Sequence, residues 1–228
     1  MPLREDVFEN NGYYHIFDKT IDDIMVFSSP KIAYEFISTF LYYRSNRASL
    51  RYSKYKKLVP TLKRNLERLI SYGKYFKVNI LAYCIMPNHY HLLLQQTHHG
   101  GIQTFMANTL NSITRFYNLL HNRKGPIFLT QFKSKKIHTE EQLVYVSRYI
   151  HTNPFASSIV KRKGDIFVYP YSSIHSYLRN SNNQYIITKN KILTYFGNDK
   201  ETYMDFIIKN ADRQKEIEHL KYTKNWLK

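Results

Sequence analysis

The sequence predicts an α+β domain with a mainly antiparallel sheet and helices on one face. Short strand-like segments are interleaved with two long segments of helical periodicity, an order that fits a ferredoxin-like arrangement. Hydrophobic residues make up 43% of the chain, which is enough for a packed core. No internal repeat or low-complexity tract interrupts this order. We expect a catalytic domain at 1–160 and a mostly helical C-terminal extension at 161–228, packed on or beside it.

The N-terminal half reads as two short strands and two helices. The expected elements are strands at 12–17 and 24–27, then helices at 29–43 and 60–72. The second helix opens at Pro60 and ends at Gly73, which are typical positions for these residues at the two ends of a helix. Its apolar residues recur at helical spacing: Leu62, Leu66, Leu69 and Ile70.

The segment 78–96 is the most strand-like in the chain, and Pro87-Asn88 breaks it once. A long helix at 102–120 follows, with apolar residues close to the 3.6-residue period. A strand is expected at 127–137. Thr139 then caps a short helix that reaches Ile150 and is stopped by Asn153-Pro154. The extension contains helical pieces that begin near 172 and 203.

The chain is strongly basic, with 34 Lys and Arg residues against 17 Asp and Glu and a formal net charge of +17. Such an excess attracts polyanions. Nucleic acid is therefore the first candidate partner, an anionic membrane the second, and a solubility device the third. No apolar run approaches the roughly 18 residues of a membrane-spanning helix, so we expect no membrane partner.

Cysteine usage and the first residues both point to the cell interior. Cys84 is the only cysteine, which excludes a disulfide framework and a Cys-rich zinc site. Residues 1–6 lack the charged-then-apolar layout of a secretory signal. These features predict a reduced, intracellular compartment.

His89 and His91 form the sharpest local feature. Residues two apart in a strand project to the same face, so two imidazoles on one pleat make half of a metal site. Two exposed strand histidines are the plainer interpretation. A histidine-triad hydrolase would need His, and a His-x-His-x-Asp metallohydrolase would need Asp, where this chain has Leu93. The remaining interpretation is a two-histidine site that is completed from elsewhere in the chain.

The helix that begins after Thr139 supplies candidates for completing this site. Tyr145, Tyr149 and Asn153 are spaced one turn apart and share one edge of the helix. A tyrosine nucleophile and an amide ligand could reach the histidine pair from there. Most of the 21 tyrosines must serve packing or surface roles, and spacing alone does not choose between Tyr145 and Tyr149.

Basic residues gather around the same part of the sequence. Cationic side chains of this kind bind phosphate groups, and neighbouring aromatics such as Phe132, Tyr145 and Phe155 could stack on unpaired bases. A solvated charged face is the usual explanation for any single run. The candidates for DNA binding are Arg115, Lys133, Lys135, Lys136 and Arg148.

Several segments, taken in order, resemble the single-tyrosine HUH transposases, and especially the REP-associated tyrosine transposases. The central likeness is Cys-Ile-Met-Pro-Asn-His-Tyr-His-Leu-Leu-Leu at 84–94. The other matching segments lie at 13–17, 131–134, 147–154, 169–173 and 195–197. The resemblance implies a ferredoxin-like core, a metal ion bound by His89 and His91, Tyr149 as the nucleophile and Asn153 as the third ligand.

The resemblance also implies a function. The expected enzyme is a transposase of a mobile element that cuts and rejoins single-stranded DNA, flanked by hairpin elements, through a covalent 5′-phosphotyrosine. Mg²⁺ or Mn²⁺ suits the ligands best. The expected location is the cytoplasm of a prokaryote, in association with the nucleoid. Two alternatives are a domesticated single-stranded nucleic-acid-binding protein and a replication-type HUH nuclease. The sequence leaves open whether the chain forms a homodimer and whether Tyr149 serves its own site or a partner's.

Overall fold

A four-stranded antiparallel sheet forms the centre of the computed structural model, which describes residues 7–129, 131–178 and 187–226. Its strands are β1 (Tyr13–Lys19), β2 (Val78–Met86), β3 (His89–Gln96) and β4 (Lys133–Ile137), in the order β2-β3-β1-β4. A long helix that follows β1 and another between β3 and β4 pack together beside the sheet, so this is the ferredoxin-like order and the predicted fold class is confirmed. Residues 1–6, which lack a secretory-signal layout, lie outside the described residues.

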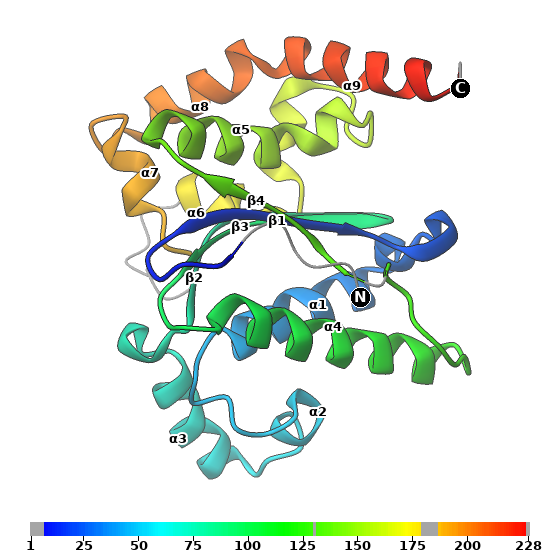
Figure 1. Cartoon of the computed structure of the whole chain (residues 1–228), viewed down its shortest axis with the longest axis vertical. Coiled ribbons are helices and arrows are strands. Elements are labelled where there is room, and N and C mark those ends of the chain that lie inside the picture. Colours follow the sequence, from blue (N-terminus) through cyan, green and yellow to red (C-terminus); the bar gives the residue numbers. More distant parts are fainter. Residues whose placement is uncertain (1–6, 130, 179–186, 227–228) are drawn as a thin grey trace.

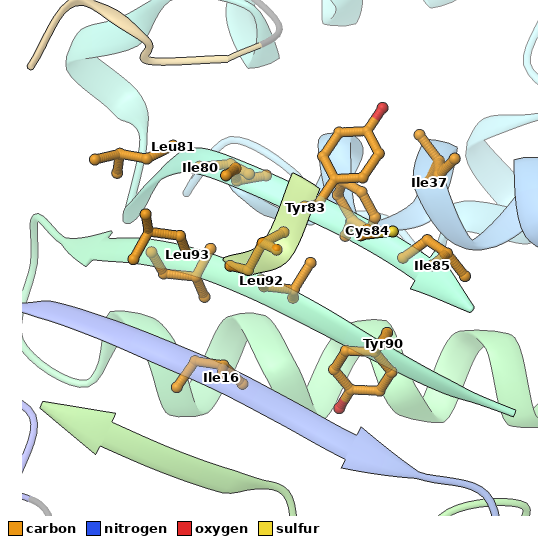
Figure 2. Packing of buried hydrophobic residues seen from close by; sticks show 14 of the residues in the cluster. Ile16, Ile37, Ile80, Leu81, Tyr83, Cys84, Ile85, Tyr90, Leu92 and Leu93 are labelled. Atoms are coloured by element: carbon orange, nitrogen blue, oxygen red, sulfur yellow. The ribbon is translucent and has the colours of Figure 1, made fainter. Parts of the chain in front are cut away.

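The hairpin of β2 and β3 is the most buried part of the sheet. Strands covered on both faces read as continuous apolar runs rather than as alternating patterns, and both strands are almost entirely buried. Figure 2 shows side chains from this hairpin packing on both sides, with Ile16 of β1 nearby. The turn at Pro87-Asn88 separates the two strands, as the sequence predicts.

One face of the sheet carries α1 (Pro30–Tyr43) and α4 (Gly101–Leu120), which pack against each other (Figure 1). Phe36 of α1 contacts Tyr90 of β3, and Phe40 contacts Tyr83 of β2. Gly101 opens α4 where a Cβ atom would lie only 2.3 Å from the Lys77 carbonyl oxygen. Only glycine permits this close approach of the helix to the chain before β2.

Beyond the helices expected on one face, α5 (Glu140–Ala156) covers the other face of the sheet. Thr139 caps α5 as predicted, because its Oγ1 accepts from the Gln142 backbone N–H. The predicted stop at Asn153-Pro154 is wrong. Pro154 sits in the last turn, where it removes a single intrahelical hydrogen bond, and the burial of residues 153–156 stabilises the extra turn.

Two predicted strands also differ from those in the structure. The short strand at 24–27 is absent: η1 (Ile21–Asp23) and η2 (Val26–Ser28) are 3₁₀ turns instead. Positive φ angles at Asp22 and Asp23 bend the chain just before this segment, and the backbone N–H groups of Val26 and Ser28 bond within the turn, to Ile24 and Met25, rather than to a neighbouring strand. The strand expected at 127–137 begins only at Lys133, because residues 127–129 form a loop joined to Thr20 by one isolated bridge at Phe128.

Smaller elements extend the core on both sides, at the bottom and at the top of the view in Figure 1. The chain between α1 and β2 forms α2 (Tyr52–Tyr55), α3 (Pro60–Ile70) and η3 (Gly73–Tyr75). The C-terminal extension contains η4 (Lys163–Val168), α6 (Ile174–Leu178), α7 (Asn190–Thr194), α8 (Lys200–Lys209) and α9 (Ala211–Trp226). Within the described ranges, no helix combines the length and the apolar character that crossing a membrane requires.

The extension is anchored on both β2 and α5. Ser172 bridges to Cys84, and the Tyr177 hydroxyl donates to the Leu81 carbonyl oxygen at 2.7 Å. Helices α8 and α9 pack on the outer side of α5 (Figure 1). The division at 160/161 into a catalytic domain and an extension therefore stays a prediction.

Candidate active site

The two histidines lie on the face of the sheet that α5 covers. In the antiparallel register, His91 of β3 pairs with Phe17 of β1, which pairs with Lys133 of β4. Directly paired residues project to the same side, so these side chains form one row across the sheet. His91 is buried, with 6% of its surface exposed, and His89 at the start of β3 is half-buried. A pocket of about 270 Å³ opens here and includes both histidines and Tyr149 in its wall.

The structure separates the two candidate tyrosines. The Tyr149 ring lies edge-on to the His91 ring, with centroids 5.4 Å apart. Tyr145 is one turn earlier, 52% exposed, and packs against Phe206 of α8. Only Tyr149 faces the histidine pair. Tyr149 lies beside the histidines of its own chain.

Asn153 completes the group that spacing predicts. Its side chain hydrogen-bonds His89, and it accepts from the Ser157 hydroxyl at 3.3 Å. Burial lowers the pKa of His89 below its usual value, and the bond to Asn153 acts in the opposite direction. On its other side, the Nδ1 atom of His89 lies 2.8 Å from the Asn88 Oδ1 atom. Burial therefore favours a neutral His89 ring, which is the form that binds metals.

These three side chains fit a small divalent cation. A histidine whose Nδ1 is held by a neighbouring group binds a metal ion through Nε2, and Asn88 holds His89 in this way. The Asn153 amide supplies an oxygen donor. Among the described residues, no three His, Cys, Asp or Glu side chains gather as a ready-made metal site. An oxygen-rich substrate such as a phosphate would supply the further ligands that Mg²⁺ or Mn²⁺ requires.

Two residues in or beside the pocket were not expected from the sequence. His15 of β1 lies under Tyr149, and its Nε2 atom is 3.0 Å from the Nδ1 atom of His91. Asp18 lines the pocket, is 3% exposed, and accepts from the Lys19 backbone N–H. Burial raises the pKa of Asp18 to about 6. The two-residue period of β1 places His15 on one face, but nothing in the sequence reveals which strand lies beside it.

A third unexpected residue comes from the C-terminal extension. The Tyr149 hydroxyl donates to Oε1 of Glu218 in α9 at 3.4 Å. Gln214, one turn earlier, donates to the Tyr149 carbonyl oxygen at 3.0 Å and accepts from the Thr152 hydroxyl. Helix α9 therefore touches both the backbone and the side chain of the candidate nucleophile. A contact over this sequence separation leaves no periodic signal.

The basic candidates divide between the two faces of the sheet. Lys133 lines the pocket, and Lys135, two residues on, shares its face. Lys136 points to the opposite face and forms an ion pair with Glu9 at 2.6 Å. Arg115 lies on α4, beyond the sheet from Tyr149, in a hollow with Arg51. The expectation that all these charges surround one site is therefore corrected.

Arg148 and the aromatic candidates occupy other positions. The Arg148 guanidinium stacks on the rings of Tyr145 and Phe206 rather than facing the pocket. Phe155 is buried, and Phe132 packs against Phe8. Of the three aromatics considered for base stacking, Tyr145 alone is largely exposed.

A solved structure of a REP-associated tyrosine transposase bound to a REP hairpin is 15% identical, covers 78% of this chain and 86% of its own, and has a TM-score of 0.49. No curated protein matches. The family described as IS200-like transposase matches residues 49–153. This segment includes His89, His91, Tyr149 and Asn153, so the family resemblance found in the sequence is confirmed over residues 49–153.

Proposed function

We propose that this protein is a metal-dependent transposase that cuts and rejoins single-stranded DNA through a covalent bond to Tyr149. The main support for this proposal is the position of Tyr149. Its ring lies against His91, over a pocket that both histidines line. The match of this segment to IS200-like transposases supports the reaction class. The substrate is single-stranded DNA flanked by hairpin elements, and Tyr149 acts on DNA at the site of its own chain.

The chemistry requires neutralisation of the phosphodiester, because its anionic oxygens repel a nucleophile. Mg²⁺ or Mn²⁺ held by His89, His91 and Asn153 would neutralise that charge and orient the phosphate. The Tyr149 oxygen then attacks phosphorus while the bond to the 3′-oxygen breaks, which leaves a 5′-phosphotyrosine and a free 3′-hydroxyl. Because the ester conserves the energy of the broken bond, a second 3′-hydroxyl can reverse the step and join new DNA.

The tyrosine must lose its proton during this attack. An ordinary phenol has a pKa of about 10, so it is mostly protonated near neutral pH. The hydroxyl of Tyr149 already donates to the Glu218 carboxylate, which is placed to accept this proton. The leaving 3′-oxygen takes a proton from solvent. Lys133 and Lys135 line the same face and would bind neighbouring phosphates by charge-assisted contacts.

A denaturant-resistant adduct tests the nucleophile. Wild-type protein incubated with labelled single-stranded DNA and Mn²⁺ should form a covalent complex, and Tyr149→Phe should abolish it. Tyr145→Phe is the matched control, because Tyr145 faces α8 instead of the histidines. An adduct that survives in Tyr149→Phe and disappears in Tyr145→Phe would refute the assignment.

The same experiment separates an enzyme from a domesticated binding protein, which would retain DNA without cleaving it. A replication-type nuclease forms the same covalent ester, so cleavage followed by joining is expected of it as well. The match of residues 49–153 to IS200-like transposases favours the transposase. Its expected place is the prokaryotic cytoplasm, beside the nucleoid.

A further inference from the structure

The buried contact between His15 and His91 has no role in the reaction as described so far. His15 of β1 pairs with Leu93, the residue two positions after His91. This places His15 and His91 diagonally on one face of adjacent strands, a separation that imidazole rings can span. Their rings are 5.1 Å apart between centroids, and the Nε2 atom of His15 lies 3.0 Å from the Nδ1 atom of His91.

We propose that His15 is a positioning residue that fixes His91 in the tautomer that binds a metal through Nε2. The inference rests on the proposed function, because it concerns the same metal site. A metal-binding histidine normally donates its second ring N–H to a neighbouring group, which fixes the ring orientation and raises the basicity of the ligand atom. Asn88 is placed to do this for His89, and His15 is placed to do it for His91.

The acceptor in this contact is the Nε2 atom of His15, which lies 3.0 Å from His91 Nδ1. The surroundings of His15 on the sheet are Phe17 on its own strand, Lys135 opposite on β4 and Tyr149 above. When His91 carries its proton on Nδ1, it donates to His15 Nε2, and the His15 proton then resides on Nδ1.

The rings of His15 and His91 also form the surface on which the Tyr149 ring packs. The Tyr149 ring lies edge-on to both histidines, with centroids 5.8 Å from His15 and 5.4 Å from His91. A rotation of His91 would therefore disturb the metal ligand and the tyrosine together. The hydrogen bond that His91 donates to His15 prevents this rotation, whereas packing alone would only limit it.

Metal titration with matched variants tests the role. His15→Leu should weaken Mn²⁺ binding about 10- to 100-fold in calorimetry, while His15→Gln, whose amide oxygen can accept from His91, should recover most of the affinity. Phe17→Leu is the control, because Phe17 packs beside His91 without hydrogen-bonding it. Equal affinity of His15→Leu and the wild type would overturn the inference but leave the proposed metal site intact. Wild-type protein that binds no Mn²⁺ would overturn that site, and the inference with it.

A second measurement needs neither metal nor variant. Nitrogen-detected NMR of the metal-free protein reports which ring nitrogen of each histidine carries the proton. We expect His91 to be protonated on Nδ1, with Nε2 unprotonated. A dominant Nε2-protonated form of His91 would overturn the proposal even if His15→Leu failed to fold.

Discussion

At the scale of single residues, three of the described histidines are buried, in two different settings. His15 and His91 lie beside Tyr149, the proposed nucleophile, whereas His151 of α5 lies outside the pocket. His151 is fully buried, with its Nδ1 atom 2.8 Å from the Tyr203 hydroxyl and its Nε2 atom 2.8 Å from the Ser173 hydroxyl. It thereby connects α5 to α8 and to the segment that packs on β2. Its role is structural, and pH dependence should reveal it.

The free energy of unfolding should decrease in acid because of His151. Burial lowers its pKa from 6.5 to about 3 in the folded protein. The unfolded chain therefore binds a proton that the folded state rejects, so this stability is present above pH 6.5 and is lost as the pH falls toward 3. The loss is about 1.4 kcal/mol per pH unit. Urea unfolding of the wild type and His151→Gln between pH 6 and 4.5 should give slopes that differ by this amount, and parallel slopes would contradict it.

At the scale of elements, α9 packs on the outer side of α5, the helix that carries Tyr149. Gln214 is buried and hydrogen-bonds both the Tyr149 carbonyl oxygen and the Thr152 hydroxyl. Gln214→Leu should loosen α9 by about 1–3 kcal/mol, because it leaves these partners unsatisfied. Hydrogen exchange along 211–219 should become faster, and adduct formation slower. Glu216→Gln, exposed on the same helix, is the control and should change neither.

The helices and strands also show which features of the fold can be predicted from the sequence. The β2–β3 hairpin and the helices α1, α3 and α4 follow from hydrophobic periodicity and from Pro and Gly at the expected ends, because those signals are local. Periodicity misses the end of α5, where burial outweighs the single hydrogen bond lost at Pro154.

The residues of the candidate site also divide into those that local sequence signals reveal and those that depend on tertiary packing. Spacing along one strand and one helix makes His89, His91, Tyr145, Tyr149 and Asn153 candidates, and the family resemblance selects Tyr149 over Tyr145. The contribution of His15 depends on the register between β1 and β3, and that of Glu218 on the docking of α9. Register and docking are tertiary properties, so neither residue carries a signal in a single sequence.

At the scale of the whole molecule, the net charge of +17 is distributed over both faces of the sheet. Lys133 and Lys135 lie on the face of the pocket, near Tyr149. Arg51 and Arg115 lie across the sheet in a hollow of about 420 Å³ between α1, α2 and α4. The total charge promotes association with any polyanion, but the position of each cation decides whether it contacts the strand being cut.

The salt dependence of DNA binding should separate these two faces. Each phosphate contact on a single strand contributes about 0.7 to the slope of log affinity against log salt. The double variant Lys133→Gln with Lys135→Gln should therefore lower the slope by about 1.4 for a short single-stranded oligonucleotide, as measured by fluorescence anisotropy. The matched control combines Lys136→Gln with Arg115→Gln. It removes the same charge, but Lys136 pairs with Glu9 on the opposite face and Arg115 lies on α4. The control should therefore keep the wild-type slope. Equal losses of slope in the two double variants would mean that DNA binding follows total charge. Lys133 and Lys135 would then have no special part in bringing the DNA strand to Tyr149.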